Sequence, residues 1–107
     1  MKEIRAIIRP SKLPRLRDAL RSMPGFPGMT VSRVEDFGRV QPTAAGGIRQ
    51  ALGDFAEKMR IEIVAPDEVA DPIVELIVAH ARTGQSGDGM VWVTEVERAV
   101  FVNKTVG

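Results

Sequence analysis

The sequence contains no cysteine and no tyrosine, and it is poor in aromatic residues of any kind. Without cysteine, the chain can form no disulfide, carries no thiolate nucleophile and offers no sulfur ligand to a metal. Four phenylalanines and one tryptophan leave a core that must be built mainly from Ile, Val, Leu, Ala and Met. Such a core is small in a chain of 107 residues. Association with further copies is a common way to stabilise a domain of this size.

The chain also lacks an excess of charge of either sign and lacks long apolar runs. Fifteen basic residues face fourteen acidic ones, which gives no electrostatic footprint for nucleic acid and no polybasic membrane signal. No run approaches the roughly 20 apolar residues of a membrane helix. The opening MKEIRAIIRP alternates charged and apolar residues, unlike a signal peptide. We expect a single-domain cytoplasmic protein that neither inserts into a membrane nor binds nucleic acid.

Motifs that carry catalysis or bind metals are missing as well. His80 is the one histidine, and no second ligand stands at metal-binding spacing from it. The sequence has no Gly-x-Ser-x-Gly, no Walker A and no His-Glu-x-x-His motif. The adjacent carboxylates Asp67 and Glu68 begin a predicted helix, where they complement its dipole. These observations predict a protein that is not an enzyme and has no metal site or required cofactor.

The chain reads as two similar halves, each with a strand, a helix and a strand. Alternating β-branched residues predict strands over residues 4–10, 29–38, 59–66 and 90–96. Apolar residues at helical spacing predict helices over 11–23 and 67–82, with Ser11 and Asp67 as candidate caps. Pro72 leaves two possibilities, a helix that starts late with Asp71 as its cap or a helix that kinks. Residues 98–102 could add a short fifth strand.

This order predicts an α+β domain of the ferredoxin-like βαββαβ type with an antiparallel sheet. Both helices should cover one face of the sheet. Alternate residues such as Ile8, Ile61 and Val91 could point to the other face, and an apolar second face would then be buried by another subunit. The connection of about residues 39–58 is unusually long for a compact domain, and such loops are more often functional than accidental. We expect residues 41–54 to be mobile without a partner, because they carry few large apolar groups.

The segment TGQSGDGMVWV, residues 83–93, places three glycines, a serine and an aspartate before a predicted strand. Glycines allow backbone N–H groups to approach an anion closely, so the segment could cradle a phosphate. A Gly-Asp-Gly sequence also occurs in ordinary turns. DFGR, residues 36–39, stands at the entrance to the long connection and could lie near a subunit cleft.

Four motifs in order resemble the P-II nitrogen-regulatory signalling family over nearly the whole chain. They are MKEIRAIIRPSKL, GMTVSRVEDFGR, KMRIEIVAPDEVAD and TGQSGDGMVWV. The resemblance implies a ferredoxin-like homotrimer that binds adenine nucleotides in the clefts between its subunits. The connection of residues 39–58 would be the family's T-loop, and TGQSGDGMVWV its B-loop. The nucleotide-binding residues that the resemblance implies are Ile7, Thr30, Gly38, Arg39, Glu62, Val64, Gly87, Asp88, Gly89 and Met90.

The departures from that family concern mostly charge. Met90 replaces the B-loop lysine, and Phe101 and Asn103 align with two arginines that reach the phosphates, with Lys104 as a partial substitute. Val40 replaces a glutamine used for magnesium and 2-oxoglutarate, Asp36 replaces a glycine, and the modified tyrosine of the loop is absent, whereas Lys58 is kept. We therefore expect ADP or AMP to bind in preference to ATP, which should bind weakly.

The first hypothesis is a regulator that senses a small ligand and acts on a protein target, such as a membrane transporter, through the long loop. The alternative is a trimer of the same fold that has lost nucleotide binding. It would act as a transporter-linked adaptor or sense another anion such as bicarbonate. An acylphosphatase-like hydrolase would need an arginine at a phosphate loop and a nearby asparagine, and no segment shows that arrangement. An RNA-binding module would need exposed aromatic residues on central strands, for which Trp92 alone is poor support.

Overall fold

The computed structural model describes residues 1–37 and 55–103. The predictions for Gly38, Arg39, Val40, Lys104 and the segment 41–54 fall outside the described residues. Within them the strands are β1 (Lys2–Ile8), β2 (Thr30–Asp36), β3 (Ala56–Ala65) and β4 (Gly89–Glu95). The helices are α1 (Leu13–Arg21) and α3 (Asp67–Ala81), and a 3-10 turn, η1 (Pro10–Lys12), precedes α1.

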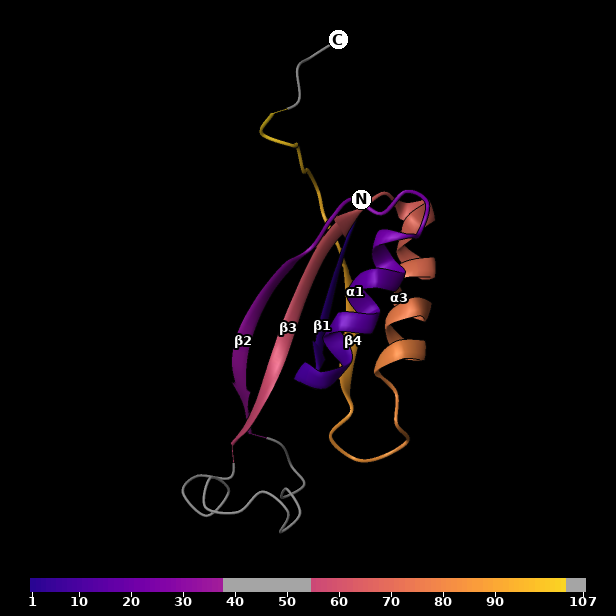
Figure 1. The fold of residues 1–107 in the computed structure, drawn as a ribbon. Coiled ribbons are helices and arrows are strands. Elements are labelled where there is room, and N and C mark those ends of the chain that lie inside the picture. Colours follow the sequence, from indigo (N-terminus) through magenta and orange to yellow (C-terminus); the bar gives the residue numbers. More distant parts are fainter. Residues whose placement is uncertain (38–54, 104–107) are drawn as a thin grey trace.

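The strands form one antiparallel sheet in the order β2-β3-β1-β4, and α1 and α3 pack together on one of its faces (Figure 1). This is the predicted βαββαβ arrangement. The core lies between the helices and the sheet, where every second residue of β1 and β3 meets the apolar stripes of the helices. Its buried members are Ile4, Ala6, Ile8, Leu16, Leu20, Ile61, Ile63, Ala65, Ala70, Ile73, Ile77 and Ala81.

The assignment of Ile8, Ile61 and Val91 to the second face of the sheet was wrong. Ala6 is buried under the helices and pairs with Ile61 on one side and Val91 on the other, so all three share the covered face. Ile8 lies two residues further along β1 and is buried on that face too. Because side chains alternate along a strand, the open face receives the odd-numbered residues of β1 instead.

The open face carries both charged and apolar residues, because Ile7, Val64 and Trp92 share it with the charged residues of β1 and β3 by strand register. Arg5 Nε lies 3.2 Å from Glu3 Oε1 and 3.6 Å from Glu62 Oε2, and Arg60 Nε lies 3.7 Å from Glu62 Oε1. Each of these side chains is partly exposed, so the pairs contribute little to the stability of a single chain. Their arrangement makes a row of alternating charge across the two central strands.

Several local predictions need correction. α3 begins at Asp67 and contains Pro72 within its second turn, so the late start at Asp71 was wrong. Ser11 lies in η1 and caps neither helix through its side chain. Asp67 is the first helical residue rather than the cap, and its carboxylate is 2.8 Å from the amino group of Met1.

The predicted fifth strand and the predicted start of the third strand also differ from the structure. Residues 98–102 form no strand, because the sheet of this chain already ends with β4 and their apolar side chains remain exposed. β3 begins at Ala56, so the last residues of the connection assigned to about 39–58 belong to the strand.

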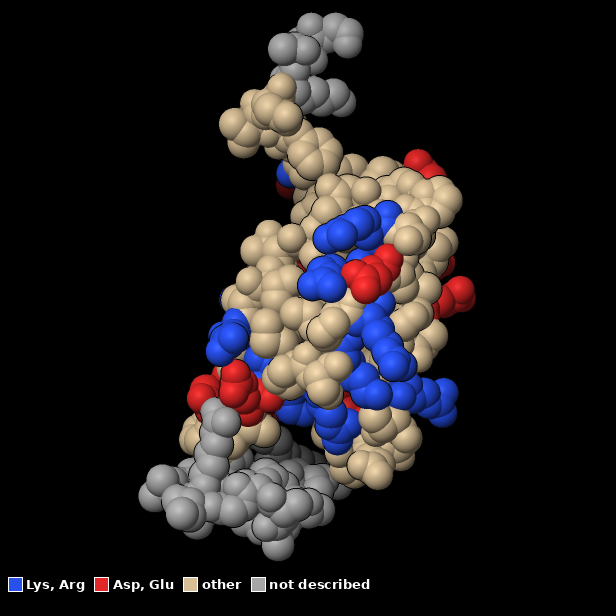
Figure 2. Space-filling view, in the orientation of Figure 1, with Lys and Arg blue, Asp and Glu red and all other residues tan. Residues whose placement is uncertain are grey.

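The near-zero net charge hides an uneven surface. Figure 2 shows Lys and Arg side chains gathered over the part of the molecule that carries α1. That helix exposes Arg15, Arg17 and Arg21, and Arg17 Nε lies 3.2 Å from Asp18 Oδ1. Neither helix in the described part of the chain has the length and apolar character that a membrane crossing requires.

Candidate functional site

The glycine-rich segment forms a tight turn between α3 and β4, and three of its glycines adopt positive φ. The φ angles are 86° at Gly84, 90° at Gly87 and 118° at Gly89. A Cβ at Gly89 would overlap the Ile7 carbonyl oxygen and lie 2.9 Å from the carbonyl carbon, which only glycine avoids. Gly89 therefore allows β4 to pair closely with β1 where the turn ends.

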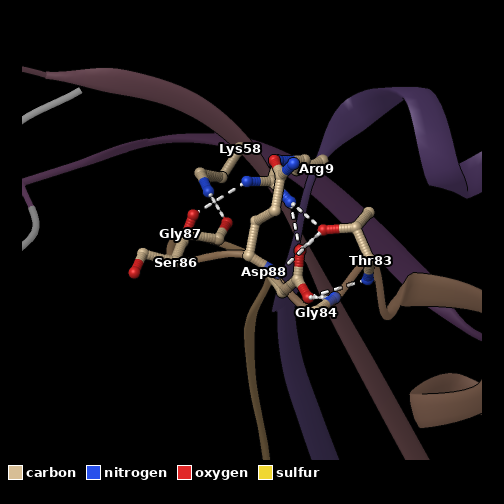
Figure 3. Close-up of polar contacts among 8 residues, drawn as sticks. Arg9, Lys58, Thr83, Gly84, Ser86, Gly87 and Asp88 are labelled. Carbon is tan, nitrogen blue, oxygen red and sulfur yellow. Dashed lines mark hydrogen bonds and ion pairs between the residues drawn. The ribbon is translucent and has the colours of Figure 1, made fainter. Parts of the chain in front are cut away.

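Asp88 holds the turn in shape from inside. Its Oδ2 accepts hydrogen bonds from the backbone N–H groups of Thr83, at 2.7 Å, and Gly84, at 2.9 Å (Figure 3). Its Oδ1 accepts from the Thr83 hydroxyl and from Arg9. These bonds, first among them that from the Thr83 hydroxyl, hold the pKa of the Asp88 carboxyl well below its ordinary value. The carboxylate is thus already used within the chain.

Arg9 joins the end of β1 to the turn and was missed in the sequence. Its Nη2 donates to the Ser86 carbonyl oxygen at 2.9 Å, and its Nη1 lies 3.2 Å from Thr83 Oγ1 as well as contacting Asp88. The signal was available in the predicted topology. Arg9 directly follows a strand whose last residue, Ile8, pairs with Gly89 at the edge of the turn.

Lys58 reaches the turn from β3. Only 6% of the residue is exposed, and its Nζ donates a hydrogen bond to the Gly87 carbonyl oxygen (Figure 3). Burial, and then the nearby Arg9 guanidinium, lower the pKa of the Lys58 ammonium, while Asp36 and Asp88 oppose the shift. A Cβ built on Gly87 would lie 3.3 Å from Arg9 Nη2 and 3.8 Å from Lys58 Nζ, so both cations flank this glycine.

The outer side of the turn is different, because it offers backbone donors, and the cation beside it is the exposed Arg82, which lines the neighbouring hollow with Met90. Among the described residues, the backbone N–H groups of Ser86 and Gly87 have no hydrogen-bond partner. Met90, the next side chain after the turn, is 65% exposed. The turn can therefore donate hydrogen bonds to an anion, whereas the cations that it contacts face its own carbonyl and carboxylate oxygens.

The described structure separates the sequence-predicted site residues into two groups. Ile7 pairs with Met90 and lies beside Gly87, Asp88 and Gly89 at the turn end of the sheet. Thr30, Glu62 and Val64 form the second group. Thr30 pairs with Glu62, and Val64 pairs with Glu3, four residues from Ile7 along β1 or about 13 Å at the usual rise of a strand.

The C-terminal residues lie with neither of these two groups. Phe101 and Asn103 follow the end of β4 that lies opposite the turn, and Figure 1 shows the chain leaving the sheet there. Phe101 is 59% exposed. One chain therefore cannot bring the turn, the Thr30 group and the C-terminal segment together around a single ligand.

A hollow of about 160 Å³ lies beside the turn, between the end of α3 and the start of β4. Most of its lining is apolar, with Ile77, Val78 and Ala81 from α3 facing Met90 and Val91 from β4. Over residues 1–37 and 55–103, no group of three or more His, Asp or Glu side chains is placed to hold a metal ion.

Comparison with known proteins agrees with this architecture. Residues 1–105 match the family described as Nitrogen regulatory protein P-II. The chain is 43% identical over 103 residues to Nitrogen regulatory protein P-II 1 of Escherichia coli (strain K12), and 41% identical over 103 residues to Nitrogen regulatory protein P-II of Haemophilus influenzae. Each alignment covers 95% of this chain and 91% of the relative. The chain therefore belongs to the nitrogen regulatory protein P-II family, whose members are regulatory signalling proteins rather than enzymes.

Proposed function

We propose that this chain is a homotrimeric P-II regulator that binds ADP or AMP in preference to ATP in the clefts between its subunits. P-II proteins are trimers that interact with small effectors and with protein targets. In this chain the connection of about residues 39–58 would carry the signal to a target in the cytoplasm. A membrane transporter is the kind of target that we favour.

The exposed Met90 at the outer side of the turn is the observation that carries this proposal. Backbone N–H groups of Ser86 and Gly87 are available to one phosphate group. The cations that would meet further phosphates are few, because Met90 is apolar and Arg9 and Lys58 donate to oxygens of the turn itself, which leaves the exposed Arg82 beside Met90. The imbalance between ligand charge and protein charge grows with each added phosphate.

The size of the effect follows from the hydrogen bonds that are missing. A charge-assisted hydrogen bond contributes about 1.5–3 kcal/mol. Loss of two such bonds, from Met90 and Phe101, would weaken ATP binding by about 3–6 kcal/mol, or roughly a hundredfold to more than ten-thousandfold. Ile7 and Val64 keep apolar side chains for the adenosine, so the penalty falls on the phosphates.

Titration calorimetry with AMP, ADP and MgATP on one preparation tests the proposal. We expect ADP or AMP to bind more tightly than MgATP. The Met90→Lys variant should raise MgATP affinity by about tenfold to a hundredfold, because it adds one charged donor. Met90→Leu is the matched control and should leave the affinity unchanged. Micromolar MgATP binding that is tighter than ADP binding in the unmodified chain would contradict the proposal.

A second candidate is a P-II trimer that no longer binds nucleotides and serves as a transporter-linked adaptor or a sensor of another anion such as bicarbonate. The apolar Met90 and Phe101, both exposed in this chain, favour it. Absence of heat with all three nucleotides, together with no gain from Met90→Lys combined with Phe101→Arg, would support this candidate over the first.

A further inference from the structure

Lys58 is a buried lysine whose charged form is poorly satisfied. Lys58 is the one charged residue that is buried in the described part of the chain, where 6% of the residue is exposed. A lysine ammonium has three N–H donors, but the Gly87 carbonyl oxygen is the one acceptor that Lys58 meets in the described part of the chain. An ammonium that is removed from water and meets one acceptor among the described residues is costly, so the site favours either a neutral amine or a new acceptor.

The groups around Lys58 come from every neighbouring element. Arg9 follows β1, Asp36 ends β2, and Asp88 lies in the turn before β4. Arg9 Nη2 and Lys58 Nζ lie against the same glycine, at 3.3 and 3.8 Å from the position of a Gly87 Cβ. The guanidinium disfavours a second positive charge nearby, and it would attract a negative charge formed on Lys58. Burial and Arg9 together lower the pKa of the Lys58 ammonium, in agreement with this geometry.

We propose that Lys58 is a carbamylation site that reacts reversibly with carbon dioxide. The protonated amine first releases a proton to water. The Nζ lone pair then attacks the carbon of CO₂, the N–C bond forms, and one C–O π pair moves to oxygen. Loss of a second proton from nitrogen leaves the carbamate, so the side chain changes from +1 to −1 with no oxidant or second substrate. A desolvated lysine is the kind of amine that attacks such an electrophile.

The product suits the surroundings better than the ammonium does. The carbamate nitrogen keeps one N–H, which can still donate to the Gly87 carbonyl oxygen. Its two oxygens are acceptors in a place where Arg9 supplies a guanidinium. Asp36 and Asp88 oppose the new negative charge, which keeps the reaction reversible. This modification does not depend on nucleotide binding and goes beyond the proposed function.

Chemical trapping tests the proposal on the full chain. The protein is equilibrated with ¹³C-labelled bicarbonate and CO₂, treated with triethyloxonium to alkylate carbamates, and mapped by mass spectrometry. The half-buried Lys12 is the internal control. We expect an adduct at Lys58 that exceeds the one at Lys12 by roughly tenfold or more, because the buried amine is more readily available in its neutral, nucleophilic form. The adduct should decrease as the pH is lowered, because protonation removes the nucleophile.

Two variants and the ¹³C NMR spectrum of the labelled protein test whether the carbamate forms on Lys58. Lys58→Arg retains the charge and should lose the ¹³C carbamate resonance of the unmodified protein. Arg9→Gln should reduce the yield by removing the favourable countercharge, provided that circular dichroism shows it folded. Equal labelling of Lys58 and Lys12, or no ¹³C carbamate signal in the unmodified chain, would overturn the proposal.

Discussion

Asp88 links its own protonation state to the shape of the turn. Its folded-state pKa is depressed, so its stabilising bonds are complete above the ordinary pKa of 3.8 and are lost as the pH falls from there toward the folded value. We expect Asp88→Asn to destabilise the chain at about pH 6.5, and the difference from the unmodified chain to shrink at about pH 3. Urea denaturation at both pH values measures it.

A matched variant for this test is Asp71→Asn, which removes one carboxylate from the exposed side of α3. It controls for the change in net charge. A stability loss for Asp88→Asn that is the same at both pH values would show that the bonds of its carboxylate are not the cause.

Gly89 and Gly84 separate backbone strain from steric overlap. Both have positive φ, but a Cβ at Gly84 meets nothing within 4 Å, whereas one at Gly89 overlaps the backbone of Ile7. We expect Gly84→Ala to lower the free energy of unfolding by about 1–2 kcal/mol and Gly89→Ala to cost at least about 2 kcal/mol more. Chemical denaturation of both variants compares them, and similar losses would mean that β4 shifts away from β1 without cost.

At the scale of the element, the two helix prolines have opposite roles. Pro14 is in the first turn of α1, where the missing N–H has no intrahelical partner to lose. Pro72 is inside α3 and faces the Glu68 carbonyl without an N–H to offer it. The first should help its helix, and the second should weaken its own.

We therefore expect Pro72→Ala to raise the free energy of unfolding by about 1–2 kcal/mol, after allowing for the greater freedom of the unfolded chain. Pro14→Ala, the control, should lower it by about 0.4–1 kcal/mol for that same reason. Thermal and urea denaturation check both values. Loss of stability in Pro72→Ala would indicate that the proline ring makes contacts that the helix needs.

At the scale of the whole molecule, the apolar side chains of Phe101 and Val102 are exposed to solvent in a single chain. Phe101 is 59% exposed and Val102 is fully exposed, on the end of the sheet opposite the turn. The predicted trimer would cover them. Burial of a large apolar side chain is worth about 2 kcal/mol, so Phe101→Ser should weaken association by roughly thirtyfold.

Sedimentation at micromolar concentration measures this effect. The exposed Ala79→Ser on α3 should leave association unchanged. A stable monomer of the unmodified chain would contradict the trimer prediction. An unchanged trimer in Phe101→Ser would show that this segment lies outside the subunit interface.

The element order and the helix-on-sheet layout were predictable from the sequence. Period-two and helical patterns depend on local spacing, and the prolines and glycines mark most boundaries. The glycine-rich turn could be located for the same reason. Which face of the sheet each strand residue points to could not be predicted. Apolar residues occur at both odd and even positions of these strands, so the pattern does not say which set faces the helices. Ile8, Ile61 and Val91 were therefore assigned to the wrong face.

Only the tertiary structure decided how the turn is held and which groups it uses. Arg9, Lys58 and Asp88 lie far apart in the sequence, and their contacts arise because β1, β3 and the turn end at one edge of the sheet. The sequence by itself determined which charges the chain carries, including the missing cation at Met90. The fold decided where the remaining charges point, because a side chain is satisfied only by partners that the sheet brings within reach.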